Sequence, residues 1–249
     1  MGARQSVYLF HRWVSVVVCL QLVAWSAGGL FFSLFSIETI RGSADARQSE
    51  VEALDWGEAV VTPRRAAAAL AGAGQTFAPL RAVCLERAGT GSMVYRLLGA
   101  ERRVLGLVDA VGGSLLPQLD AAAAVRVAME DFAPSADVAS VELISEDPPL
   151  EVRGRDLPVW KVVFDHPRRP HIYVDAISGE VVARRNRLWR IFDFFWMLHI
   201  MDYSQRENFH HPLLTAMSAL ALLSSLSGLA LWGWRLGAWR RRRSRGGTS

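Results

Sequence analysis

Cysteine is scarce in this chain of 249 residues, which contains only Cys19 and Cys84. Cys19 lies inside a long apolar run and Cys84 lies outside it, so the two are not expected to pair and no disulfide framework is predicted. No two cysteines have the spacing of metal ligands. The sequence also contains no His-Glu-x-x-His, no Gly-x-Ser-x-Gly, no phosphate-binding loop and no dinucleotide fingerprint. A self-contained hydrolase is therefore not expected.

Charge is absent from two long stretches of the chain, residues 14–35 and 212–234. Each stretch exceeds the ~20 apolar residues that cross ~30 Å of hydrocarbon, and a backbone in lipid satisfies its own hydrogen bonds by forming a helix. The first stretch continues past Ala27 to Phe35, beyond the roughly 7–15 residues of a signal-peptide core. We therefore predict an uncleaved anchor rather than a cleaved signal peptide, and a membrane protein with two spans.

Basic residues flank the predicted spans on the sides of the two chain ends. Arg4 and Arg12 lie before the first span, and residues 240–245 (RRRRSR) follow the second. Arginines beside a span stay on the cytoplasmic side, which predicts cytoplasmic termini and a domain outside the cytoplasm. An arginine-rich tail can also bind nucleic acid. This tail, however, adjoins three tryptophans within residues 232–239, and tryptophans in that position are typical of the membrane interface. The predicted partner is membrane lipid and not nucleic acid.

The predicted organisation has five segments. They are residues 1–37 (cytoplasmic N-terminus and first span), 38–187 (extracytoplasmic domain), 188–208 (interfacial amphipathic helix and turn), 209–236 (second span) and 237–249 (basic cytoplasmic tail). Arg190, Asp193 and Asp202 interrupt the aromatic residues of the third segment, so it is too charged to cross and is expected on the outer membrane surface, with its rings in the headgroups. Ser224 and Gly228 favour close helix contact, either between the two spans or between copies of the chain.

The segment between the spans contains two similar halves. The matched pairs are 62–70 (TPRRAAAAL) with 120–125 (DAAAAV), 95–98 (YRLL) with 160–163 (WKVV), and 108–116 (VDAVGGSLL) with 174–182 (VDAISGEVV). Self-similarity of this kind indicates two copies of one supersecondary unit.

Each half is predicted to be a helix followed by antiparallel strands. Thr62 and Asp120 are N-cap residues, and alanine-rich runs, the strongest helix formers, follow them. Strands are indicated by β-branched and aromatic residues at 140–144, 158–164 and 170–174. Asp109 and Asp175 begin Asp-Ala-x-x-Gly turns, so each half ends in a hairpin in which the Asp is structural rather than catalytic. The fold class is α+β, with two helix-plus-antiparallel-strand units packed together on two transmembrane helices.

The end of the second half, residues 160–163 (WKVV) and 173–181 (YVDAISGEV), resembles a PepSY domain, and the first half is a looser match. The segments beside the spans resemble the PepSY-associated transmembrane family in residues 11–13 (HRW), 196–203 (WMLHIMDY), 208–214 (NFHHPLL) and 227–232 (SGLALW). Larger members of that family carry four spans, whereas this chain has two. The resemblance implies a tandem PepSY-like domain on the bacterial inner membrane and a link to haem-dependent iron or siderophore reductase systems.

The four histidines at the predicted membrane boundaries are His11, His199, His210 and His211. If the chain bends after residue 203, His199 comes near His210, and two imidazoles can bind a haem iron axially. His11 is expected at the cytoplasmic end, where a haem would need a second subunit or a partner protein. The resemblance thus implies haem b held by these residues, although polar rings at an interface need no ligand. His166 and His171 flank a turn and are expected at the surface.

Three functions fit these observations. The first is an accessory or haem-linked electron-transfer subunit of an iron or siderophore reductase system. The second is an extracytoplasmic module that binds a peptidase or regulates it, since PepSY domains resemble the inhibitory parts of peptidase propeptides. The third is a membrane scaffold or assembly factor without a redox role. All three predict a membrane or periplasmic protein partner, and association with a second copy of the chain is an alternative.

Overall fold

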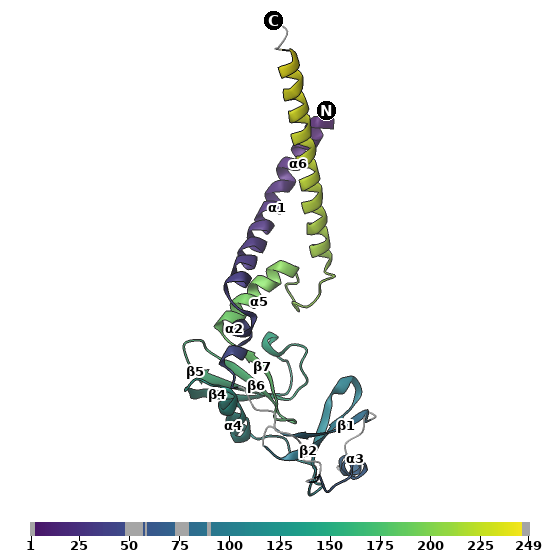
Figure 1. Cartoon of the computed structure of the whole chain (residues 1–249), viewed down its shortest axis with the longest axis vertical. Helices are drawn as coiled ribbons and strands as arrows, with labels where there is room; N and C mark the ends of the chain where they lie inside the picture. Colours follow the sequence, from purple (N-terminus) through teal and green to yellow (C-terminus); the bar gives the residue numbers. More distant parts are fainter. Residues whose placement is uncertain (1–2, 48–56, 58, 73–79, 89–90, 246–249) are drawn as a thin grey trace. The chain divides into compact units, whose positions relative to one another are not determined.

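The computed structural model describes residues 3–47, 57, 59–72, 80–88 and 91–245, with side chains between residues 5 and 240 of these ranges. The chain divides into two compact units (Figure 1). One unit is Ile37–Arg190, and the other joins the two ends of the chain, Met1–Ser36 and Ile191–Ser249. Two long apolar helices and two small antiparallel sheets with short helices make the protein α+β, as predicted.

The first half of the Ile37–Arg190 unit is a helix packed on a three-stranded sheet. Its elements are α3 (Pro63–Gly72), β1 (Ala82–Arg87), β2 (Met93–Leu98) and β3 (Val104–Asp109). The strands pair antiparallel in the order β1-β2-β3. The Thr62 hydroxyl accepts a hydrogen bond from the Arg65 N–H at 3.3 Å, which confirms the predicted N-cap. Leu70, Leu97 and Val108 are buried together in the core of this half.

The second half repeats this plan with one more strand. Its elements are α4 (Ala121–Asp131), β4 (Asp137–Ile144), β5 (Val159–Asp165), β6 (His171–Asp175) and β7 (Val181–Arg185), in the antiparallel order β4-β5-β6-β7. Asp120 accepts a hydrogen bond from the Ala123 N–H at 2.7 Å and begins α4 as predicted. Ala124 and Ala128 are fully buried against one face of the sheet. The opposite face carries a second apolar cluster around Tyr173 and Val152.

The Asp-Ala-x-x-Gly elements form equivalent turns in the two halves. The Asp175 carboxylate accepts hydrogen bonds from the N–H groups two and three residues later, at 2.9 Å and 2.5 Å, and Asp109 does the same. Gly113 and Gly179 follow with φ of 75° and 72°, which glycine adopts without steric cost. One oxygen of each carboxylate thus holds the turn, which confirms the predicted structural role of these aspartates.

The described residues also include shorter helical turns. They are α2 (Ile37–Arg41) and the 3₁₀ turns η1 (Ser43–Asp45), η3 (Ala100–Arg102) and η4 (Leu150–Val152).

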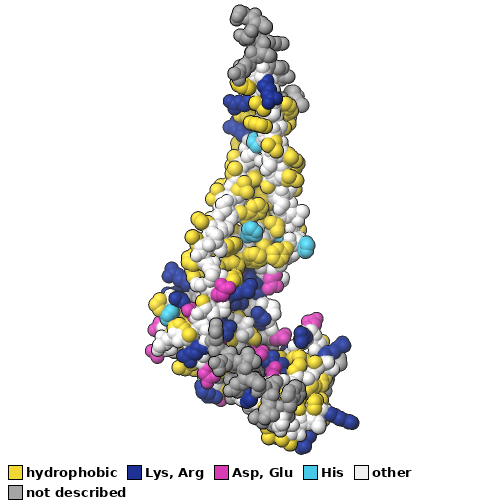
Figure 2. All heavy atoms as spheres, in the orientation of Figure 1, with side chains coloured by type: hydrophobic (Ala, Val, Ile, Leu, Met, Phe, Trp, Pro, Cys, Tyr) yellow, Lys and Arg dark blue, Asp and Glu magenta, His cyan; other side chains and the backbone are white. Residues whose placement is uncertain are grey.

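Two long helices form most of the other unit, α1 (Ala3–Leu34) and α6 (Pro212–Arg245). Within them, Gln5–Leu34 and Pro212–Arg240 are long and apolar enough to cross a membrane. Their surface is largely hydrophobic, with Lys and Arg side chains gathered near the chain ends (Figure 2). The two predicted spans therefore correspond to two helices of suitable length and composition.

A third helix, α5 (Arg187–Ile200), runs antiparallel along the second half of α1. The Phe192 ring lies 4.8 Å from that of Phe32, and the Phe195 ring lies 5.6 Å from that of Phe31, centroid to centroid. Gly28 lies directly beside Phe195, and a Cβ at Gly28 would lie 3.4 Å from the Phe195 Cβ. These two rings therefore pack on protein, whereas the sequence alone placed the aromatic residues of this helix among lipid headgroups.

Candidate functional site

His11 lies between α1 and α6. Its Nδ1 is 2.8 Å from the Ser227 hydroxyl and 3.1 Å from the Ser224 carbonyl, and Ser15 on the next turn of α1 is 2.8 Å from the Ser224 hydroxyl. Gly228 makes room for the ring, because a Cβ there would lie 3.0 Å from His11 Cε1. Ser224 and Gly228, the small residues for which close helix contact was predicted, therefore lie where α6 contacts α1 of the same chain. His11 is part of that contact.

His199 lies at the end of α5 with an exposed ring. The ring is nearly parallel to Trp196, at a centroid distance of 6.2 Å, and lies 5.9 Å from the Trp25 ring. Trp25 Nε1 donates to the His199 carbonyl at 3.1 Å, and Gln21 Nε2 donates to the Leu198 carbonyl at 2.9 Å. These donors satisfy two carbonyls that the helix end leaves without intrahelical partners. Helix α1 therefore holds the end of α5 and, with it, His199.

The loop between α5 and α6 is organised around Asp202. Its carboxylate accepts hydrogen bonds from the Ser204 hydroxyl and from the N–H groups of Ser204, Gln205, Glu207 and Asn208. These bonds, the Asn208 N–H foremost and the Ser204 hydroxyl next, hold the pKa of Asp202 well below its ordinary range. Asp193 of α5 pairs with Arg206, and Trp196 Nε1 donates to the Arg206 carbonyl at 3.1 Å. The polar break seen in the sequence is therefore an ordered loop.

The other two histidines of the predicted haem site lie immediately before α6. His210 is exposed, and His211 Nδ1 accepts a hydrogen bond from the Leu213 N–H at 3.3 Å. His11 is about four helical turns, roughly 21 Å, from Trp25 and hence from His199. This separation does not fit a haem that uses His11 together with His199 of the same chain. Haem b held by His199, His210 and His211 stays a prediction.

A carboxylate network that the sequence did not reveal lies in the second half of the Ile37–Arg190 unit. Glu151 Oε2 accepts a hydrogen bond from the Tyr173 hydroxyl at 2.6 Å and lies 2.7 Å from His171 Nδ1. Glu151 Oε1 accepts from Arg190 Nε at 2.8 Å, and the Glu151 carbonyl accepts from Arg185 Nε at 2.7 Å. The network connects η4 with β6, β7 and the start of α5.

Burial alone would raise the pKa of Glu151. Hydrogen bonds from His171 and Tyr173, with the positive charges of His171 and Arg190, outweigh burial and lower this pKa to about 2. Burial, followed by the hydrogen bond to Glu151, raises the pKa of Tyr173 well above its ordinary value. Burial lowers the pKa of Arg185 to about 10.

The expected surface position of His171 is wrong, because its side chain is only 20 % exposed and is paired with Glu151. A signal was present in residues 171–175 (HIYVD), which do not alternate between polar and apolar. An unbroken run of this kind is typical of a strand that is buried on both faces.

An amphipathic groove of ≈ 520 Å³ lies at the junction of the two halves. Among the residues that line it are Leu107, Leu116, Leu119, Ile177, Gln118 and Arg126. They come from β3, the linker before α4, α4 itself and the β6–β7 turn. A mainly apolar lining with a few polar groups, and a volume in the range of roughly 300–1,000 Å³, are typical of ligand sites.

Arg96 holds the two halves together by ion pairs. Its Nε lies 2.5 Å from Glu86 Oε1 within the first half, and its guanidinium forms a fork with Glu180 of the second half. The hydrogen bond to Glu180 is the largest contribution to a raised Arg96 pKa, and burial raises the pKa of Glu86. The linker between β3 and α4 is fixed as well, because the Leu119 carbonyl accepts a hydrogen bond from Trp160 Nε1 at 2.8 Å. The groove is therefore a built feature of the fold.

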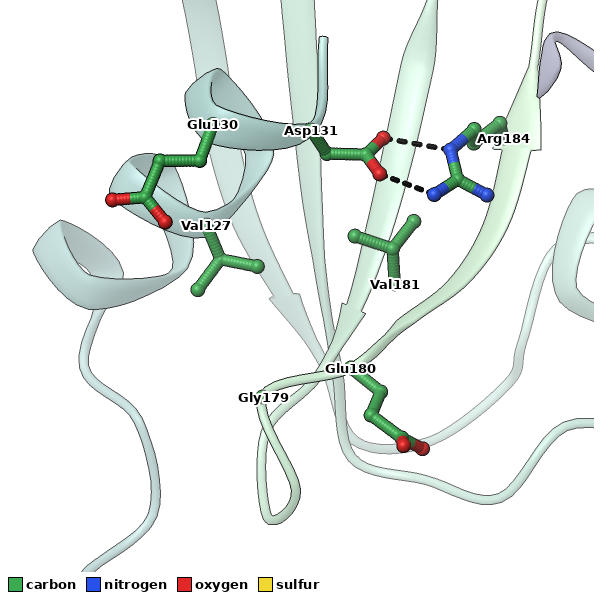
Figure 3. A pocket seen from close by; sticks show the side chains of 7 residues that line it. All are labelled: Val127, Glu130, Asp131, Gly179, Glu180, Val181 and Arg184. Atoms are coloured by element: carbon green, nitrogen blue, oxygen red, sulfur yellow. Dashed lines mark hydrogen bonds and ion pairs between the residues drawn. The ribbon is translucent and has the colours of Figure 1, made fainter. Parts of the chain in front are cut away.

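A second hollow of ≈ 490 Å³ lies between α4 and β7 (Figure 3). Asp131 and Arg184 form a two-pronged ion pair on one side of it, and Glu130 extends away from that pair. Glu180, which also lines the hollow, is already paired with Arg96. Most of its charges thus stabilise the fold, so the amphipathic groove is the better candidate for a ligand.

Comparison of the chain with protein-family models, curated proteins and solved structures finds no match in any of the three. The resemblance to PepSY proteins therefore depends on the motifs given above. In the described part of the chain, no group of three or more His, Cys, Asp or Glu side chains is placed to hold a metal ion.

Proposed function

We propose that this chain is a two-pass membrane protein whose folded unit binds a protein partner outside the cytoplasm, as a scaffold or regulatory module. The observation that carries the proposal is the amphipathic groove at the junction of the two halves. The groove lies between the two halves of the Ile37–Arg190 unit, which Arg96 holds together, so it is a preformed surface, and preformed surfaces lose less entropy on binding.

The assignment of the acidic residues supports binding rather than catalysis. Asp109, Asp120 and Asp175 accept backbone hydrogen bonds, and Glu151 is occupied by Tyr173, His171 and Arg190. A general acid or base needs a position within reach of a substrate proton. These carboxylates are instead used to hold turns, a helix start and the sheet.

The proposed topology is tested by Cys84, the cysteine that lies outside the predicted spans. Cys84 lies on β1 and is exposed. In spheroplasts, a membrane-impermeant maleimide should label the wild-type protein and not the Cys84→Ser variant. Labelling that requires membrane rupture would place the domain in the cytoplasm and overturn the proposed topology.

The binding role is tested by photo-crosslinking in cells. A benzoylphenylalanine at Gln118, in the groove, should give one defined adduct that mass spectrometry identifies, whereas the same group at Val111, exposed and outside the groove lining, should not. Ala123→Trp places an indole in the groove and should abolish the adduct. Equal adducts at both positions, or none at Gln118, would contradict the proposal.

Haem-linked electron transfer is the alternative proposal. The observation that favours it is the placement of His199 against Trp25 and Trp196, since aromatic side chains suit an apolar cofactor. When bound, haem would supply one-electron chemistry. The described residues contribute the exposed imidazole of His199, and Trp25 holds the backbone carbonyl of that residue.

A further inference from the structure

Strand β4 is the most exposed strand of the described structure. Residues 139–143 are exposed in succession, whereas none of the other six described strands has two consecutive exposed residues. Val141 is 38 % exposed and Leu143 is 43 % exposed, although they lie opposite Val162 and Trp160 on the face that packs against α4. The apolar face of the sheet therefore continues into solvent along β4.

One edge of β4 is open. The strand pairs with β5 along its length and is the first strand of the sheet, so among the described residues no strand pairs with its other edge. In an antiparallel pair, every second residue directs its N–H and C=O away from the partner strand. A register shift between Val138 and Ser140 disturbs only the beginning of the strand. No described strand pairs with the rest of this edge, and proteins ordinarily protect the hydrogen-bonding groups of such an edge.

The chain segment that contains β4 carries charge of one sign. Residues 127–149 contain six acidic residues and no basic residue, in a chain whose net charge is +4. Asp131 is paired with Arg184, and Glu142 is 3.7 Å from Lys161. The exposed carboxylates of Asp137, Glu146 and Asp147 have no ion-pair partner among the described side chains.

We infer that β4 binds an extended, basic segment of a partner protein by strand addition. Backbone groups of the segment would pair with the open edge, its lysines or arginines would lie near the carboxylates, and its apolar side chains would pack on Val141 and Leu143. A second copy of β4 is disfavoured because it carries the same acidic residues. An anionic lipid surface is disfavoured for the same reason and offers no strand to pair. The inference rests on the proposed role as a protein-binding module.

The test uses the full chain in phosphatidylcholine nanodiscs and a fluorescent octapeptide of alternating lysine and valine. Anisotropy should show saturable binding that weakens with salt, and hydrogen exchange should slow within β4. Glu142→Lys should weaken binding about five- to tenfold, whereas Glu101→Lys, the same charge change at an exposed site in the first half, should alter it less than about twofold. Circular dichroism checks that both variants fold.

Other outcomes separate this inference from the proposed function. Ala123→Trp should leave peptide binding unchanged, because it alters the groove and not the edge. No saturable binding, equal binding of an alternating glutamate–valine peptide, or slowed exchange at β1 instead of β4 would overturn strand addition. If the Gln118 adduct persists in that case, the groove remains a binding site and only the edge is excluded.

Discussion

Replacing Glu151 by alanine is expected to destabilise the Ile37–Arg190 unit by about 3–5 kcal/mol. The substitution removes the acceptor of the Tyr173 hydroxyl, whose residue is fully buried, and the counter-charge of Arg190. An unsatisfied buried hydroxyl costs about 1–3 kcal/mol, and the lost charged hydrogen bonds add a similar amount. For a unit of this size the Tm should fall by roughly 6–20 °C.

The assay is thermal unfolding of the full chain in detergent, followed by near-ultraviolet circular dichroism. Glu142→Ala is the matched control, because Glu142 is 63 % exposed and has one ion pair at 3.7 Å. Its effect should stay within about 0.5 kcal/mol. If the two variants lower the Tm equally, Glu151 is not the centre of a stabilising network and the reasoning fails.

The same residue predicts a pH dependence. The pKa of Glu151 is about 2 in the folded protein, against an ordinary value of 4.5. A carboxylate whose pKa is lower in the folded protein stabilises it fully when the pH is above the pKa of the unfolded chain. This stabilisation is lost as the pH falls toward the pKa of the folded protein. The wild-type Tm should therefore fall more steeply between about pH 5 and pH 2 than that of Glu151→Gln. Parallel curves would show that this carboxylate does not contribute.

Three further predictions concern the helices, the turns and the cofactor. Gly228→Leu should weaken the contact of α1 with α6, because a Cβ at Gly228 would lie 3.0 Å from His11. The variant should therefore lower the temperature at which the detergent-solubilised protein aggregates. Gly233→Leu should not change that temperature, because a Cβ at Gly233 meets nothing within 4 Å. Asp175→Ala should cost about 1–3 kcal/mol and speed hydrogen exchange in the β6–β7 turn, and unchanged exchange would argue against its role. Purified protein from haem-replete cells should show a Soret band that His199→Ala removes if the haem proposal holds, and colourless wild-type protein would refute that proposal.

Local signals were sufficient for much of the fold. The hydrophobic length of the two helices, the N-caps at Thr62 and Asp120, and the turns at Asp109 and Asp175 were all readable from short stretches of sequence. Each of these features depends on groups within a few residues of one another. The similarity of the two halves allowed further predictions, because an element recognised in one half indicated its counterpart in the other.

The candidate site was less predictable because it depends on contacts between distant segments. Glu151 lies 20 residues before His171 and 22 before Tyr173 in the chain, and no spacing rule connects them. His11 was predicted as a boundary histidine, but its contact with Ser224, more than 200 residues later, follows only from how two helices pack.

The sequence by itself determined which parts of this protein are apolar enough to span a membrane, where its short helices begin and that its folded unit is built twice, since hydrophobic length, capping and turn chemistry act over a few residues. Tertiary structure alone decided that His11 faces serines of α6, that α5 packs on α1, and that β4 is left with an open edge. Those outcomes depend on which surfaces are buried against each other, and burial is a property of the packed chain rather than of any one segment.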